Sequence, residues 1–219
     1  MDRGKNQTTQ RVAMFVIAAL TYSTTLNAQR PLDRTKGFVL GVHTIGATGL
    51  TVSGNDMEGG DLTTSFGAGA GLMLGYGFTK SITGYASFDV AKQGPGNGEF
   101  EGNLGLSHVQ IGARAYLPLG MGATMPYLTG SFGRRSLAAR VSDDFNGAYD
   151  MSFSGTAFGI GGGFERMISP TMAFDGGVEA SFGRFNHAEI ADMSGSIDLN
   201  GTTSIRLKAG MTWRPGRGR

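Results

Sequence analysis

The sequence predicts an all-β protein, a closed antiparallel eight-stranded transmembrane β-barrel. The first observation behind this prediction is an alternation over residues 65–78, where even positions are apolar and odd positions are mostly glycine. A period of two is typical of a β-strand with two different faces. The second observation is that no run of about 18 apolar residues follows the N-terminal segment, which excludes a transmembrane helix. Membrane barrels escape this criterion because their apolar residues occupy alternate positions.

The composition narrows the class of protein further. The 219 residues include 38 glycines without a collagen-like triplet repeat, and no cysteine. The lack of cysteine excludes disulfides, thiolate metal sites and a lipoprotein anchor. A protein without disulfides has to be stabilised by hydrogen bonds and packing, both of which a closed barrel supplies.

The N-terminal residues 1–28 are predicted to be a cleaved signal peptide, and residues 29–219 the barrel domain. Basic residues precede an apolar stretch at residues 12–20, and Ala28 offers a cleavage site. The signal contains Arg3, Lys5 and Arg11 of the 19 basic residues and Asp2 of the 17 acidic ones, which leaves 16 of each. A nearly neutral mature chain gives no support for nucleic-acid binding. The expected location is the outer membrane of a Gram-negative-type bacterium.

The predicted strands follow one another with alternately long and short connections. Long loops are expected at residues 47–62, 93–101, 134–150 and 184–201, and short turns at residues 79–81, 118–124 and 169–171. This rhythm is typical of outer-membrane barrels, which have long extracellular loops and short periplasmic turns. The eight alternating segments are residues 37–46, 65–78, 82–90, 106–117, 126–132, 158–165, 172–182 and 205–213.

One face of each predicted strand is apolar, and we expect this face to contact lipid. The opposite face combines glycines with a few charged residues. The residues expected to face lipid include Phe66, Leu72, Leu74, Phe88, Ile111, Phe158, Phe174 and Trp213.

The charged residues on the opposite face are predicted to fill the lumen as a network of ion pairs. Eight strands close to a diameter that inward side chains can fill, and unpaired charges there are costly. Glu179 and Arg206 are expected to be cross-strand neighbours, with His108 and Tyr85 near the network. The predicted network comprises Asp89, Arg114, Glu165, Asp175, Glu179, Arg206 and Lys208.

We predict no catalytic residues, no cofactor and no metal site. Ser107 and His108 are adjacent on a strand, so their side chains point to opposite faces and cannot form a dyad. His187, Glu189 and Asp192 offer possible metal ligands, but a polar loop of this composition is usually only solvated. Glycine-rich strings around Gly69 and Gly159 lie inside predicted strands, so they are not nucleotide-binding loops.

Three segments resemble a known family. Residues 125–133 (MPYLTGSFG), the glycine-rich residues 157–164 and the closing pattern Arg206-Leu207-x-x-Gly210-x-x-Trp213 are similar to the small eight-stranded outer-membrane β-barrels, the porin-like opacity and attachment-invasion barrels related to the membrane domain of outer membrane protein A. The resemblance covers the mature chain and implies insertion by the barrel assembly machinery. Such barrels often end on the aromatic residue that this machinery recognises, whereas here residues 214–219 (RPGRGR) follow Trp213.

The leading functional hypothesis is a non-enzymatic barrel with a structural role, or a surface-interaction role through its long loops. Loops held by a rigid scaffold are where binding concentrates, so the unidentified surface ligand is expected at residues 47–62, 134–150 and 184–201. The alternatives are a membrane-embedded lipid-modifying hydrolase and a narrow pore. Outer-membrane lipid is the other expected partner.

Overall fold

The computed structural model describes residues 35–52, 62–63, 67–94, 104–118, 123–143, 147–190 and 193–215. The predicted signal peptide, the centre of the predicted 47–62 loop and Phe66 lie outside these residues. The strands are β1 (Gly37–Val52), β2 (Leu62–Thr63), β3 (Gly67–Gly77), β4 (Ile82–Gln93), β5 (Leu104–Tyr116), β6 (Thr124–Asp143), β7 (Gly147–Met167), β8 (Met172–Ile190) and β9 (Met193–Trp213).

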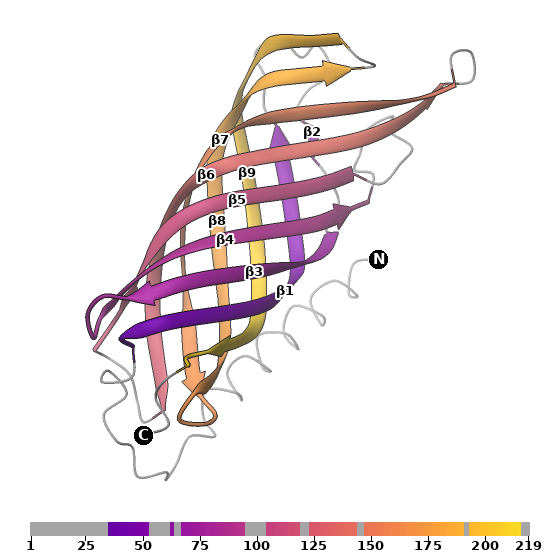
Figure 1. Ribbon diagram of the computed structural model, residues 1–219. Helices are drawn as coiled ribbons and strands as arrows, with labels where there is room; N and C mark the ends of the chain where they lie inside the picture. The colour runs from indigo at the N-terminus through magenta and orange to yellow at the C-terminus, as the bar shows by residue number, and fades with distance from the viewer. Residues whose placement is uncertain are drawn as a thin grey trace, which may run out of the picture.

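The eight long strands close into a barrel (Figure 1). Each of β3 to β9 pairs antiparallel with the next, and the barrel closes where β1 pairs with both β3 and β9. The two-residue strand β2 pairs with the end of β1. The prediction of a closed antiparallel eight-stranded barrel is therefore confirmed. Within the described residues, no helix is long and apolar enough to cross a membrane.

The two faces of the strands have opposite chemistry, as a period of two requires. Large apolar side chains are exposed on the outside, for example Leu72 at 59% and Ile111 at 67%, while the inward positions are buried and carry mostly glycines and polar residues. This distribution is the reverse of that in a water-soluble protein. All described residues predicted to face lipid are among the exposed ones: Leu72, Leu74, Phe88, Ile111, Phe158, Phe174 and Trp213.

The substitution Leu72→Arg tests the lipid-facing assignment. Leu72 lies in the middle of β3 and is paired with Val42 and Phe88, which are also exposed and apolar. An arginine at the middle of a lipid-facing strand costs about 2–4 kcal/mol. We expect a loss of this size in the free energy of unfolding measured in lipid bilayers. Unchanged stability would contradict the assignment.

Two of the short turns use the same hydrogen-bonding device. In the β3–β4 turn, Thr79 Oγ1 accepts hydrogen bonds from the backbone amides of Ser81 and Ile82 at 3.2 and 3.0 Å. In the β7–β8 turn, Ser169 Oγ accepts from Thr171 and Met172 at 3.3 and 3.0 Å. A hydroxyl that satisfies amides two and three residues ahead stabilises a tight turn. Both turns lie where short connections were predicted.

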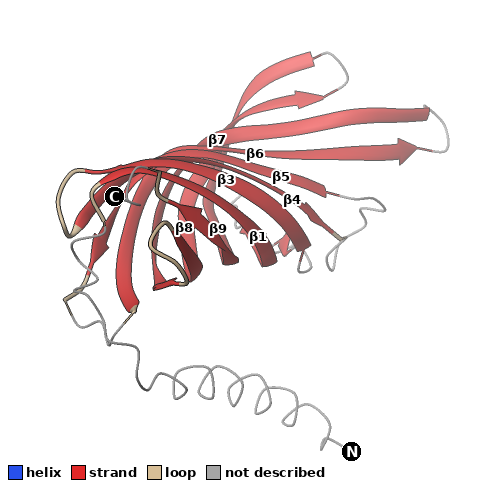
Figure 2. Ribbon diagram, turned by 60° about the horizontal axis from the view of Figure 1, so that its bottom comes forward, coloured by secondary structure: helices blue, strands red, loops and turns tan. Residues whose placement is uncertain are grey.

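The predictions of long loops at residues 134–150 and 184–201 are wrong. The first segment continues β6 and β7, which pair without interruption as far as Asp143 and Gly147. The second continues β8 and β9, which pair as far as Ile190 and Met193. The predicted 47–62 loop is also too long, because β1 extends to Val52. The hairpins formed by β6–β7 and β8–β9 both reach past the ends of β3 and β4 (Figures 1 and 2).

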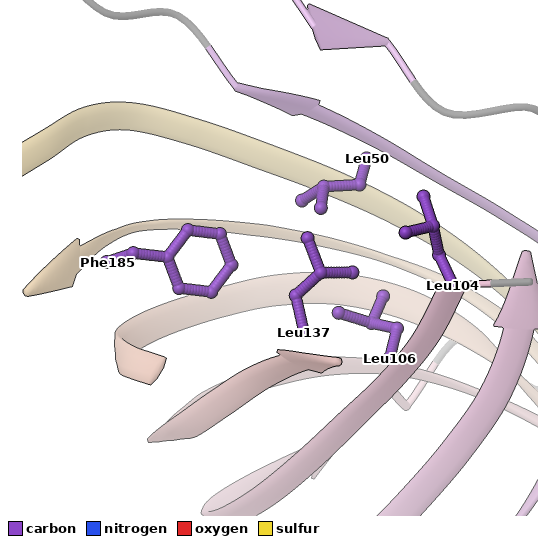
Figure 3. Close-up of a cluster of buried hydrophobic side chains, with 5 residues drawn as sticks. All are labelled: Leu50, Leu104, Leu106, Leu137 and Phe185. Atoms are coloured by element: carbon purple, nitrogen blue, oxygen red, sulfur yellow. The ribbon is translucent and has the colours of Figure 1, made fainter. Parts of the chain in front are cut away.

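An apolar cluster packs the interior where these hairpins leave the barrel. Figure 3 shows its side chains, which come from β1, β5, β6 and β8 and point toward one another. Phe153 of β7 also packs against the cluster, with its ring centroid 6.3 Å from that of Phe185. At the base of the hairpins the inward side chains are apolar, so the extended strands are stabilised there by a hydrophobic core. The cluster consists of Leu50, Leu104, Leu106, Leu137 and Phe185.

Candidate functional site

Among the described residues, the barrel lumen contains two groups of ion pairs, which we name by their central arginines. The strands place these residues at alternate inward positions, so that charges distant in sequence meet inside the barrel. The Arg206 cluster consists of Asp89 on β4, Glu179 on β8, and Arg206 and Lys208 on β9. The Arg114 cluster consists of Arg114 on β5, Glu165 on β7, Asp175 on β8, and Arg214 directly after β9.

In the Arg206 cluster, two bases share two carboxylates. Arg206 Nη1 lies 2.5 Å from Asp89 Oδ2, and Nη2 lies 2.7 Å from Glu179 Oε1. Lys208 Nζ lies 2.8 Å from Asp89 Oδ2 and 3.0 Å from Glu179 Oε2. Glu179 and Arg206 are direct register partners on β8 and β9. Each acid thus contacts both bases, and Arg206 and Asp89 are each only 1% exposed.

Other side chains satisfy further hydrogen-bonding groups of this cluster. Arg206 Nη2 also donates to Ser181 Oγ and Gln110 Oε1, at 2.9 and 3.1 Å. Ser131 Oγ donates to Glu179 Oε1 at 3.0 Å, and His43 Nε2 lies 2.8 Å from Asp89 Oδ1. Charge-assisted hydrogen bonds of this kind offset part of the desolvation cost of buried charges.

The Arg114 cluster lies closer to the end of the barrel that carries the short turns. Arg114 Nη1 lies 2.5 Å from Asp175 Oδ2 and 3.4 Å from Glu165 Oε2. Arg214 Nη2 lies 2.6 and 2.9 Å from the two oxygens of Glu165, and its Nε donates to Oε1 at 3.1 Å. Arg214 also donates to the carbonyl of Thr35, which connects the C-terminal end of β9 to the residues before β1.

Two tyrosines complete the Arg114 cluster. Tyr116 Oη donates to Glu165 Oε2 at 2.6 Å, and Tyr127 Oη donates to Asp175 Oδ1 at 2.9 Å. The guanidinium carbon of Arg114 lies 3.9 Å from the centroid of the Tyr127 ring, which is a close cation–π contact. Together with Met125, the two tyrosines form a buried cluster next to the ion pairs.

Inward glycines provide the space that the charged side chains occupy. A β-carbon on Gly71 would overlap Asp89 Oδ1 and His43 Nε2, and one on Gly159 would overlap Ser131 Oγ and Glu179 Oε1. Any larger residue at these positions would displace the charges. The glycine-rich face seen in the sequence is therefore complementary to the ion pairs on the facing strands.

Each cluster is balanced in charge, with two bases and two acids when His43 is neutral. Between the clusters lies a small cavity of about 40 Å³, bordered by Arg114 and Asp175 on one side and by Glu179 and Lys208 on the other. A polar cavity of this size has room for a few water molecules. The lumen is therefore filled mainly by side chains.

A further buried charge, Arg135 on β6, lies between the Arg206 cluster and the apolar cluster. Its guanidinium donates to Ser204 Oγ and to Thr202, and its central carbon lies 5.1 Å from the Phe185 ring centroid. Among the described residues, no ion pair joins Arg135 to a carboxylate. His108, its register partner on β5, is also buried.

The seven residues predicted for the lumen all point inward, but they belong to two clusters instead of one paired network. Arg114 pairs with Glu165 and Asp175, whereas Asp89 and Glu179 pair with Arg206 and Lys208. Two further inward charges lie outside the predicted set: Arg135, in the segment expected to be a loop, and Arg214, in the segment expected to be a tail. Both continue the inward alternation of their strands, and this alternation was the signal that could have identified them.

The other residues considered for chemistry are not brought together in a reactive site. Ser107 lies on the outside of β5, while His108 is buried inside. His187 and Glu189 lie on β8 and not in a loop, and Asp192 lies outside the described residues. Within the described part of the chain, no three histidine, cysteine or acidic residues are grouped so that they could hold a metal ion.

Comparison with known proteins identifies similar folds only. No protein-family profile matches the chain, and no curated protein sequence matches it. Among solved structures, the match to neisserial surface protein A covers 82% of this chain and 97% of that protein's chain, with 13% identity and a TM-score of 0.58. The attachment invasion locus protein of Yersinia pestis, in complex with the heparin analogue sucrose octasulfate, covers 81% and 99%, with 16% identity and a TM-score of 0.51.

A third similar structure is also an outer-membrane protein. A major outer membrane protein from Thermus thermophilus covers 80% of this chain and 99% of its own, with 10% identity and a TM-score of 0.52. In all three cases the match spans nearly the whole of the solved structure. The chain therefore has the fold of the small outer-membrane β-barrels.

Proposed function

We propose that this protein is a bacterial outer-membrane barrel that is closed to ions, has no catalytic activity, and serves as a rigid anchor for two surface hairpins that bind a partner. The observation that carries the proposal is the contrast between its two parts. The barrel interior is filled by charge-balanced clusters. In contrast, β6–β7 and β8–β9 continue well beyond the apolar belt, the band of exposed apolar side chains on the outside of the barrel.

The outer-membrane location is supported by the outside of the barrel. Its apolar side chains form a continuous surface over all eight long strands, which in water would be an aggregation liability. The described chain ends, at Thr35 and Arg214, meet at the end with the short turns. In a barrel of this type that end faces the periplasm and the long connections face outward.

The surface role is supported by the packing at the base of the two hairpins. Residues of β6, β7, β8 and β9 pack around the apolar cluster, with Ala139, Phe153 and Ile197 at its edge. A preorganised surface loses less conformational entropy on binding than a flexible loop does. The hairpins thus offer a fixed recognition surface held above the membrane.

Accessibility of single cysteines tests the location and the orientation. Because the natural chain has no cysteine, each introduced thiol is the sole target of a maleimide. We expect a membrane-impermeant maleimide to label Ser194→Cys, exposed on the distal part of β9, on intact cells. Lys80→Cys, in the β3–β4 turn, is the matched control and should react only after the outer membrane is permeabilised. The reverse pattern, or equal labelling of both, would contradict the proposal.

Planar-bilayer recording tests whether the lumen is closed. Ion-paired side chains occupy the lumen, and the cavity between the two clusters is small, so we expect the folded protein to insert without steady conductance. Stable ohmic channels from the wild-type protein would show that the charges line a water-filled pore.

A further inference from the structure

The outer surface carries a groove that the surface role leaves unused. It has a volume of about 710 Å³ and lies across β5 to β8, at the upper edge of the apolar belt. The register of β7 against β8 shifts between Ser154 and Ala157, so the regular sheet is interrupted at this point. Its size is within the range of typical small-molecule sites.

The two ends of the groove differ in chemistry. The lower end is formed by Val109, Ile111 and Phe132, which are exposed at 57%, 67% and 56% and belong to the apolar belt. The upper end is formed by exposed polar residues, including Arg134 and His187. None of the described residues that line the groove is acidic, so the arginine is not neutralised there by a carboxylate.

Arg134 and His187 both lie next to Ser154. Arg134 Nη2 donates to Ser154 Oγ at 2.8 Å, and His187 is the register partner of Ser154 on the other side. This hydrogen bond uses one of the five donors of the guanidinium. The remaining donors and the imidazole are thus available to a ligand that accepts several hydrogen bonds.

The spacing of the two ends fits an amphipathic ligand. Phe132 and Arg134 are two residues apart on the outward face of β6, which corresponds to about 7 Å along a strand. A lipid phosphate lies a similar short distance above the start of its acyl chains. Arginine forms bidentate, charge-assisted hydrogen bonds with phosphate.

We propose that this groove is a binding site for a phosphate-bearing lipid of the outer leaflet. The phosphate contacts Arg134 and His187, and one acyl chain lies against Val109, Ile111 and Phe132. The inference rests on the outer-membrane location proposed above, and it adds a specific lipid contact on the outer wall, at the base of the surface hairpins.

A matched pair of lipids tests the site with the full-length folded protein. Dioleoylphosphatidic acid and dioleoylglycerol have the same chains and differ in the phosphate. Each is titrated into the barrel in zwitterionic micelles, and binding is followed by the NMR signals of the Gly133 and Gly155 amides, whose residues line the groove. We expect saturable binding of phosphatidic acid and binding of dioleoylglycerol that is at least about tenfold weaker, as the loss of a charge-assisted contact implies.

Two substitutions and one control locate the contact. Arg134→Gln and His187→Gln, both on the exposed outer wall, are expected to weaken phosphatidic acid binding, the first by about tenfold. Lys92→Gln removes an exposed base on β4 that does not line the groove, and should leave the affinity within about twofold. Heat-dependent gel mobility verifies that each variant is folded.

Three outcomes would overturn the proposal. Equal binding of the two lipids would reduce the groove to an apolar surface, and equal weakening by Lys92→Gln would reduce the effect to general charge attraction. Saturation by inorganic phosphate at the same concentration as the lipid would assign the site to a soluble anion. All three are measured on purified protein, so they are independent of the cysteine-labelling result that tests the cellular location.

Discussion

Replacing Arg206 by methionine is expected to lower the free energy of unfolding by about 3–5 kcal/mol, because removing one member of a buried ion-pair group leaves uncompensated charges. Arg206 is 1% exposed and contacts both Asp89 and Glu179. Lys208 alone would remain to balance the two carboxylates. Methionine keeps the aliphatic part of the side chain, so the loss reports mainly on the missing guanidinium. The measurement is urea-induced unfolding of the refolded barrel in lipid bilayers.

Lys208→Met is the matched control for this experiment. Lys208 contacts the same two carboxylates, but its side chain is 15% exposed and borders the cavity between the clusters. Water screens it more effectively, so the expected loss is smaller than for Arg206. If both variants lost less than about 1 kcal/mol, the lumen would be as well solvated as a protein surface, and the closed-barrel proposal would fail.

Replacing Glu165 by glutamine is expected to have an effect of similar size, about 3–5 kcal/mol. Glu165 is fully buried and accepts hydrogen bonds from Arg214, Tyr116 and Arg114. Glutamine keeps the shape but leaves Arg214 without a carboxylate partner in its cluster. The same unfolding experiment in bilayers measures the loss.

A double-mutant cycle with Arg214→Gln separates the ion pair from other effects. If the pair accounts for the stability, the double variant will lose much less than the sum of the two single variants, since neither charge is left alone. Additive losses would instead indicate that Glu165 and Arg214 act independently. In that case Arg214 would not connect the end of β9 to the barrel interior.

The barrel itself could be predicted from the sequence because the membrane imposes a simple rule. Within the belt, outward residues such as Leu72, Ile111 or Phe158 are predominantly apolar, and the strand period then fixes which residues point inward. The same rule placed Asp89, Arg206 and the other five lumen charges on the correct face. One sequence pattern therefore determined both surfaces.

The rule fails where the strands leave the belt. On β6 the outward side chain changes from Phe132 to Arg134, while the inward one changes from Arg135 to Leu137. The alternation continues, but the polar residues now lie on the outside and the apolar ones on the inside. The outward apolar residues therefore stop at this point although the strand continues. For this reason the sequence pattern predicts loops where the structure has hairpins.

The division into two clusters could not be predicted for a different reason. Parity states that Arg114 points inward, but its partners depend on the relative stagger of β5, β7 and β8. The stagger of a barrel is a property of the closed sheet, and no local pattern in the chain encodes it. Only a contact between facing residues of adjacent strands, such as Glu179 and Arg206, can be predicted from the sequence.

The distribution of the clustered charges along the chain bears on how the barrel closes. Three of the four bases in the clusters, Arg206, Lys208 and Arg214, belong to β9 or directly follow it, whereas all four acids lie on β4, β7 and β8. An open sheet of the earlier strands therefore carries an excess of inward carboxylates, which repel one another. The last strand brings the compensating cations together with the final row of backbone hydrogen bonds to β1. Closure of the seam and neutralisation of the interior are thus one event, and a strand of other sequence inserted at that seam would leave the carboxylates without counter-charges.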